Sequence, residues 1–222
     1  MSATLEEIHN RLLDTYGHQH WWPGESPFEV MVGAVLVQNT SWKNVERAIE
    51  NLRERDLLDP VALHQVPVEE LAELIRPAGY YRIKARRLCN LLDLVVERYG
   101  GSLEAMFQSS LETLREELLA VNGIGPETAD SILLYAGGMP TFVVDTYTHR
   151  VFARHGWIDF SARYHEIKEH FESGLEKDPQ LYNEYHALLV RVGHLHCRKT
   201  PKCAGCPLAG LLPEGGPREP EF

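Results

Sequence analysis

Apolar residues recur at helical spacing along almost the whole chain, and this period limits the fold more than any other feature. Phe28, Met31, Val32 and Val35 mark one face of a helix, because residues three or four apart lie on the same side of an α-helix. The same spacing returns at 45–52, 71–75, 83–95, 111–119, 132–136, 151–152, 167–171 and 185–192. One short β-branched run, 141–144, is isolated and predicts an extended linker. The sequence therefore predicts an all-α protein of about ten helices.

Glycine and proline separate the predicted helices, and the break at Gly123-Ile124-Gly125-Pro126 is the most informative one. Pro126 is expected to open a helix, because a helix does not need an N–H at its first position. Glycine lets a phosphate approach the turn closely, while the next helix offers unpaired amides and the positive end of its dipole. The pattern indicates a helix–hairpin–helix over residues 115–136. Taken alone, the Gly-x-Gly pattern is more typical of a glycine-linked helical hairpin that binds no ligand.

An acidic residue follows the predicted hairpin. Asp145 comes after the apolar run 142–144 and directly before a new helical period, where an aspartate often caps the helix. Together with the hairpin at this separation, however, Asp145 resembles the helix–hairpin–helix DNA glycosylases of the endonuclease III superfamily. The resemblance runs from Phe28 to Cys206. In that superfamily the aspartate at the position of Asp145 is the catalytic carboxylate.

The resemblance also implies an architecture. It predicts a six-helix lobe over residues 27–138 that ends in the hairpin, and a second helical lobe that combines residues 1–26 with 139–222. A DNA cleft would lie between these lobes. The hairpin glycines Gly123 and Gly125 would clamp phosphates beside the lesion.

The second residue of the helix after the hairpin decides, in this superfamily, whether the enzyme also cuts the DNA strand. Strand-cleaving members carry a lysine there, because an amine can attack the sugar and form a Schiff base. This chain carries Glu127, and a carboxylate cannot form an imine. The resemblance therefore implies a monofunctional glycosylase that uses water as its nucleophile. Asp145 would stabilise an oxocarbenium-like sugar and position or deprotonate that water.

Tryptophans and neighbouring motifs point to one branch of the superfamily, the bacterial 3-methyladenine DNA glycosylases of endonuclease III type. The stretches that resemble this branch are Trp21-Trp22-Pro23, Gln38-Asn39-Thr40-Ser41-Trp42, Arg76-Pro77-Ala78-Gly79-Tyr80-Tyr81 and the hairpin itself. An aromatic residue beside an apolar period is otherwise typical of a core. In the branch, aromatics matching Trp21 or Trp22 and Trp42 sandwich the flipped base. A cationic alkylated purine would gain cation–π energy on the order of 0.5–2 kcal/mol from an indole face.

Flipping a base leaves a gap in the duplex and costs a few kcal/mol. The resemblance places Gln38 as the residue that fills the gap, and Tyr80 as a second wedge on the opposite strand. For Gln38 the alternative is a capping role at the end of its predicted helix.

The distribution of charge along the chain agrees with DNA binding, although the net charge does not. The chain has 22 basic and 32 acidic residues and a net charge of −10, which argues against indiscriminate coating of nucleic acid. Two stretches, within 76–87 and 191–206, carry basic residues and no acid. They contain Arg82, Lys84 and Lys199, and they predict a face that tracks phosphates. The alternative for each stretch is a solvated helix surface.

Three of the four cysteines, Cys197, Cys203 and Cys206, lie within ten residues of one another. Without a visible export signal, this spacing favours metal ligands over disulfides. The fourth, Cys89, lies in an apolar helical pattern and is predicted to be a core thiol.

Endonuclease III relatives bind a [4Fe–4S] cluster through four cysteines spaced C-x6-C-x2-C-x5-C. Here position 212 is leucine, and a strict count puts His196 in place of the first cysteine. Cys197 fits if the loop is one residue shorter, which leaves His196 or His194 as a fourth ligand. An iron–sulfur cluster, a zinc ion and an empty site stay open.

The sequence thus predicts a base excision repair enzyme that hydrolyses the N-glycosidic bond of an alkylated purine in double-stranded DNA. One alternative is a glycosylase for oxidised or mismatched pyrimidines, and another is a non-catalytic, structure-specific DNA-binding protein. No apolar run approaches the roughly 18 residues of a membrane span, and no signal peptide is visible. We therefore expect a monomer in the cytoplasm, associated with the nucleoid, and no membrane partner.

Overall fold

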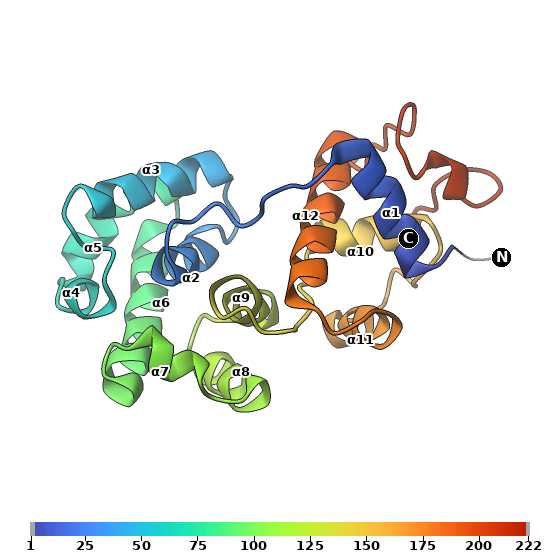
Figure 1. Ribbon diagram of the computed structural model, residues 1–222. Coiled ribbons are helices and arrows are strands. Elements are labelled where there is room, and N and C mark those ends of the chain that lie inside the picture. Colours follow the sequence, from blue (N-terminus) through green and yellow to red (C-terminus); the bar gives the residue numbers. More distant parts are fainter. Residues whose placement is uncertain (1–2, 221–222) are drawn as a thin grey trace. The chain divides into compact units, whose positions relative to one another are not determined.

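The computed structural model describes residues 3–220 (Figure 1). Residues 1–2 and 221–222, which the predicted second lobe includes, lie outside the described part. Within residues 3–220 the regular elements are all helical and no strand occurs, so the predicted all-α class is confirmed. Residues 141–145 carry no regular secondary structure, as expected for the linker. The chain divides into two compact units, unit 1 from Met1–Trp21 with Pro140–Phe222, and unit 2 from Trp22–Met139.

Unit 2 contains six helices of six or more residues and two of five residues, counted over its described length. The longer ones are α2 (Pro27–Leu36), α3 (Trp42–Arg53), α5 (Val68–Leu74), α6 (Tyr81–Asp93), α8 (Leu111–Ala120) and α9 (Pro126–Ser131). The five-residue helices are α4 (Pro60–His64) and α7 (Leu103–Phe107). A 3-10 turn, η1 (Arg76–Ala78), precedes α6, and π-helical turns extend α6 and α9 as η2 (Leu94–Arg98) and η3 (Ile132–Ala136).

Helix α2 forms the centre of unit 2, and every residue after Pro27 in it is buried. The helix begins where the Ser26 side chain accepts a hydrogen bond from the Glu29 amide and Pro27 takes the first helical position. It packs against α3, α6, α9 and η3 (Figure 1). Apart from Glu29, the helix is apolar on all sides, which is typical of a helix in an interior. Its C-terminal end leads into the loop that carries Gln38 to the hairpin. Cys89 is only partly buried against this core.

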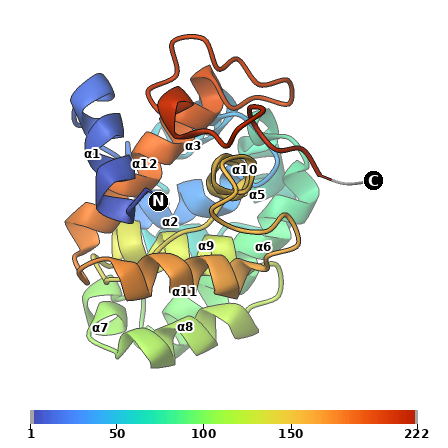
Figure 2. The same ribbon diagram turned by 90° about the vertical axis from the view of Figure 1, so that its right-hand side faces the viewer.

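Unit 1 joins the two ends of the described chain. It contains α1 (Leu5–Tyr16), α10 (Thr146–Arg154), α11 (Tyr164–Gly174), α12 (Pro179–Leu195) and the 3-10 turn η4 (Ala209–Leu211). Helix α12 packs against both α10 and α1, and Figure 2 shows α1 alongside it. Phe142 stacks on Phe171 with ring centroids 3.9 Å apart, and the rings of Tyr182 and Tyr185 meet Phe142 edge-on. The Tyr185 hydroxyl donates to the Leu5 carbonyl at 2.9 Å, which fastens α1.

Among the described residues, no helix is both long enough and apolar enough to cross a membrane.

Candidate active site and nucleic-acid interface

The predicted hairpin is present as α8, a short turn and α9. Gly123 has φ +95°, and a Cβ atom there would lie 2.3 Å from Cγ of Arg87, so the turn requires glycine at this position. Gly125 has ordinary backbone angles, and a Cβ atom at this position would meet nothing within 4 Å, which leaves this side of the turn open to a ligand. Pro126 opens α9 as predicted, and Glu127 follows as its exposed second residue.

A buried ion pair fastens the two hairpin helices to each other. The Arg115 guanidinium donates to both carboxylate oxygens of Asp130, at 2.8 and 3.1 Å. Asp130 is fully buried. The sequence alone indicated no role for either residue, because their pairing depends on how the two helices of the hairpin pack.

Gln38 is bonded to the hairpin. Its amide nitrogen donates to the Thr128 hydroxyl at 2.9 Å and to the Gly123 carbonyl at 3.3 Å, and its oxygen accepts from Arg87. To fill a gap in a duplex, this side chain would have to exchange these bonds for bonds to DNA. The structure therefore brings the predicted gap-filling residue to the predicted phosphate clamp.

Tyr80 lies at the start of α6 in a left-handed conformation with φ +47°, and 70% of its surface is exposed. Positive φ is uncommon for a bulky residue, and such local strain is concentrated at functional sites. Ile83, one turn further on, is also exposed. Arg82 is exposed and its guanidinium lies 5.4 Å from the Tyr81 ring, so aromatic and basic groups are adjacent here.

The prediction that Lys84 binds DNA is wrong. Lys84 is 1% exposed, and its ammonium donates to the carbonyls of Leu36 at 2.7 Å and Ala78 at 2.8 Å. Burial, together with the nearby charge of Arg87, lowers its pKa to about 8. Lys84 ties the end of α2 to η1, and its ammonium is buried away from any DNA. Lys199, in contrast, is exposed in the C-terminal segment as a phosphate contact requires.

The tryptophans predicted to form the base pocket are divided between the two units, with Trp21 in unit 1 and both Trp22 and Trp42 in unit 2. Trp22 and Trp42 meet edge-to-face, with centroids 5.1 Å apart and planes at 90°, and both rings lie against Gly33 of α2. Tyr135 also packs against Trp22, at 5.1 Å. A flat base cannot enter between two rings in this arrangement. Trp21 lines a hollow of about 440 Å³ in unit 1, whose other lining residues include His9, His18, His20, Asp178 and Glu184.

An acidic hollow of about 500 Å³ lies beside Trp42 in unit 2. Its charged lining residues are Glu25, Glu29, Glu46, Glu50 and Arg53. Arg53 pairs with Glu29 at 3.0 Å and with Glu50, so the lining keeps an excess of negative charge next to an indole ring. Such a hollow favours a flat, cationic ligand.

Asp145 is the N-cap of α10. Its Oδ1 accepts from the Thr148 amide at 2.7 Å, so the capping role is real. Its second oxygen, Oδ2, lies 3.8 Å from Nε2 of His186 on α12, and 12% of the Asp145 side chain is exposed. Burial and then the negative charge of Asp145 raise the pKa of Tyr147. One oxygen of this carboxylate is thus held by the helix, and the other lies outside the cap.

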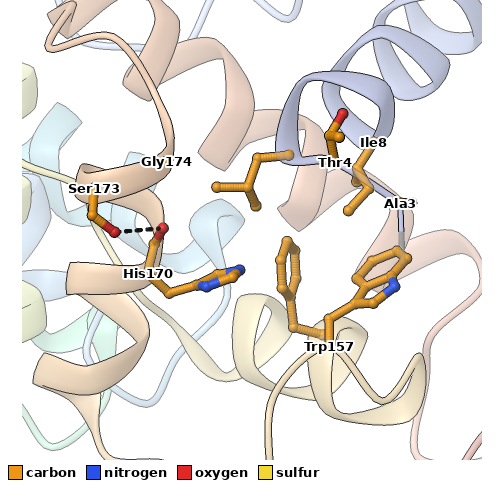
Figure 3. A pocket seen from close by; sticks show the side chains of 9 residues that line it. Ala3, Thr4, Ile8, Trp157, His170, Ser173 and Gly174 are labelled. Atoms are coloured by element: carbon orange, nitrogen blue, oxygen red, sulfur yellow. Dashed lines mark hydrogen bonds between the residues drawn. The ribbon is translucent and has the colours of Figure 1, made fainter. Parts of the chain in front are cut away.

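Another hollow in unit 1, about 290 Å³, lies where α1 meets α10 and α11 (Figure 3). Figure 3 shows the His170 ring pointing into the hollow from α11, with Trp157 and Ile8 across the opening. Its lining residues include no carboxylate or thiol, so it offers no group for the predicted reaction.

The three C-terminal cysteines line one small cavity of about 20 Å³, and His196 and Leu212 line it as well. Leu212 occupies the sequence position of the fourth cysteine, and its apolar side chain has no atom that can bind iron. Nδ1 of His196 lies 3.0 Å from the Lys202 carbonyl. Within residues 3–220, no three His, Cys, Asp or Glu side chains are arranged to hold a metal ion. This donor set does not fit a four-thiolate cluster.

Arg154 holds the same C-terminal segment in place. Its guanidinium, 3% exposed, donates to the carbonyls of Arg198 and Lys199 and pairs with the Glu219 carboxylate at 3.0 Å. It also lies 3.6 Å from the Cys197 sulfur. Side chain and backbone contacts from α10 therefore fix a segment that has little regular structure of its own.

Comparison with known proteins identifies the class. Residues 32–177 match the HhH-GPD superfamily of base excision DNA repair proteins, and the chain belongs to this superfamily. It is a base excision DNA glycosylase by family. A Methanocaldococcus jannaschii protein that is provisionally named a DNA repair glycosylase is 54% identical, over 92% of this chain and 93% of its own. Endonuclease III of Bacillus subtilis is 30% identical, over 87% and 84%.

Solved structures show the same fold. A Helicobacter pylori 3-methyladenine DNA glycosylase bound to 1,N6-ethenoadenine is 31% identical, has a TM-score of 0.76, and is matched over 86% of this chain and 98% of its own. Endonuclease III in a trapped covalent complex with DNA is 27% identical, with a TM-score of 0.81 and coverage of 96% and 97%. The chain is thus similar to enzymes that bind DNA.

Proposed function

We propose that this protein is a monofunctional DNA glycosylase that hydrolyses the N-glycosidic bond of alkylated purines in double-stranded DNA. The acidic hollow beside Trp42 carries this proposal. A purine methylated at N3 or N7 is cationic, so it gains both from the indole face and from the surrounding carboxylates. A neutral base can stack on the indole but lacks the positive charge on which both of these attractions depend. The hollow therefore favours an alkylated purine over a normal one by charge.

Asp145 carries the chemistry in this proposal. Its Oδ2 lies outside the helix cap and would stabilise the positive charge that develops on the sugar, or accept a proton from the attacking water. An alkylated purine leaves as a neutral base, which removes the need for a strong acid at the base. Glu127 at the second position of α9 supports hydrolysis without strand cleavage, because it cannot form an imine.

One of the similar solved structures supports a purine as the base. The H. pylori glycosylase is named for 3-methyladenine and holds 1,N6-ethenoadenine in its structure. We also propose that the hairpin, Tyr80, Arg82 and Lys199 contact the DNA and that Gln38 fills the gap left by the flipped base. The protein would work as a monomer at the nucleoid. No step of the proposed reaction uses a metal.

The test compares base release from duplexes that carry 7-methylguanine, 1,N6-ethenoadenine, thymine glycol or a G·T mismatch. We expect release of 7-methylguanine and its loss in Asp145→Asn. Glu46→Gln removes one carboxylate from the hollow and should slow release of cationic 7-methylguanine about two- to five-fold, the worth of one exposed charge. Release of the neutral ethenoadenine should stay unchanged. Preferential release of a pyrimidine contradicts the proposal.

A pyrimidine glycosylase is the second candidate. The edge-to-face contact between Trp22 and Trp42 favours it, because a smaller ring can stack on one indole face without separating the two. The same set of duplexes decides between the candidates. A wild-type protein that binds these duplexes and releases no base from any of them would instead be a DNA-binding protein without turnover.

A further inference from the structure

His186 lies inside unit 1, where α12 packs against α10. It is 5% exposed, and Nε2 of its ring lies 3.8 Å from Oδ2 of Asp145. It is flanked on the buried face of α12 by Tyr182, Tyr185 and Leu189. The packing of α12 on α10 thus holds the imidazole beside the carboxylate.

The cap alone does not fix the Asp145 carboxylate. The bond from the Thr148 amide holds Oδ1, but a single hydrogen bond leaves the plane of the carboxylate free to turn about it. A second contact at Oδ2 fixes that plane, and catalytic groups lose rate when their orientation is left to vary. His186 is placed to supply the second contact.

The charge state of His186 suits this role. Burial lowers its pKa, an effect that the nearby Asp145 charge partly offsets. A neutral ring leaves the full negative charge on Asp145, whereas an imidazolium would neutralise it and weaken its attraction for a cationic sugar. The tautomer with its proton on Nε2 presents a donor toward Oδ2.

We propose that His186 is a positioning residue for Asp145, orienting Oδ2 toward the reacting sugar and water. This inference rests on the proposed function, in which Asp145 is the catalytic carboxylate. The 3.8 Å separation exceeds a hydrogen bond, and contacts of this kind shorten when substrate draws the catalytic group into place. His186 itself touches no substrate in this arrangement.

Three substitutions of His186 separate positioning from packing. Phe fills the space without a donor, Gln places an amide nitrogen near the position of Nε2, and Asn carries the same amide but is too short to reach it. The measurement is the single-turnover rate of base release, with DNA affinity measured separately. Tyr182→Phe is the matched control, since Tyr182 is buried one turn away on α12 and its hydroxyl makes no hydrogen bond within residues 3–220.

We expect His186→Phe and His186→Asn to lower the single-turnover rate about 10- to 100-fold, as loss of an orienting partner does elsewhere, with DNA affinity within about two-fold. His186→Gln should recover most of the rate, and Tyr182→Phe should keep all of it. Equal rates for the Gln and Asn variants overturn the inference, even if the Phe variant does not fold. If Asp145→Asn keeps the wild-type rate, the proposed function fails and the inference fails with it. If Asp145→Asn is inactive and His186→Asn is fully active, only the inference fails.

Discussion

Asp130→Asn is expected to destabilise unit 2 strongly, because it breaks the ion pair that joins α8 and α9. Asp130 is fully buried and accepts two hydrogen bonds from Arg115, whose side chain is 27% exposed. Removal of one partner of a buried pair typically costs about 3–5 kcal/mol. Because Asn keeps one acceptor oxygen and Arg115 is partly hydrated, we expect the lower end, about 3 kcal/mol. For a chain of this length, that lowers the melting temperature by roughly 6–12 °C.

An exposed pair supplies the control. Arg55 and Glu70 approach to 3.5 Å with side chains 59% and 53% exposed, and Glu70→Gln should cost about 0–1 kcal/mol. The assay is urea and thermal unfolding of both variants beside the wild type. The double variant Arg115→Met, Asp130→Leu should be more stable than Asp130→Asn, because it leaves no charge without a partner. If Asp130→Asn and Glu70→Gln differ by less than about 1 kcal/mol, the assigned role of the pair is refuted.

Three further predictions concern other parts of the chain. Folding lowers the pKa of Lys84 from 10.5 to about 8, so between these pH values the unfolded chain binds a proton that the folded chain does not. The free energy of unfolding should therefore rise by about 3 kcal/mol from pH 8 to 10.5 and fall again as pH drops. Urea unfolding of Lys84→Met should lack this rise. At Gly123 the backbone has φ +95°, and a Cβ atom would lie 2.3 Å from Arg87, so Gly123→Ala should cost about 1–3 kcal/mol in stability. Gly125→Ala should unfold like the wild type but weaken DNA binding, measured by filter binding or fluorescence anisotropy. Arg154→Met should make the C-terminal segment sensitive to protease. For the wild type, a metal chelator should leave the melting temperature unchanged, and finding four iron atoms per purified chain would contradict this second expectation.

Local signals in the sequence were sufficient for the hairpin and the linker. A proline after two glycines predicted the start of α9, and the isolated run before Asp145 predicted the segment that leads into α10. Both features depend on backbone preferences of a few consecutive residues, which tertiary packing did not override. The all-α class followed from the apolar period for the same reason.

Side-chain partners were harder to predict. Lys84 lies at helical spacing with Leu88 and Leu91 on the buried face of α6. The apolar period therefore already indicated that Lys84 is buried, but its positive charge suggested a DNA contact instead. His186 likewise falls within an apolar period of α12. No local pattern could show that Trp21 and Trp22, although adjacent, belong to different units, since that depends on where the whole chain divides.

The arrangement of unit 1 has a consequence for synthesis on the ribosome. Helix α1 emerges before unit 2, but the surface that covers it belongs to α12, which is translated only after the whole of unit 2. Residues 22–139 are complete well before that point and contain their own core. The nascent chain must therefore keep an amphipathic α1 uncovered while the inserted unit folds, and any arrest of translation before Pro179 leaves α1 without its partner.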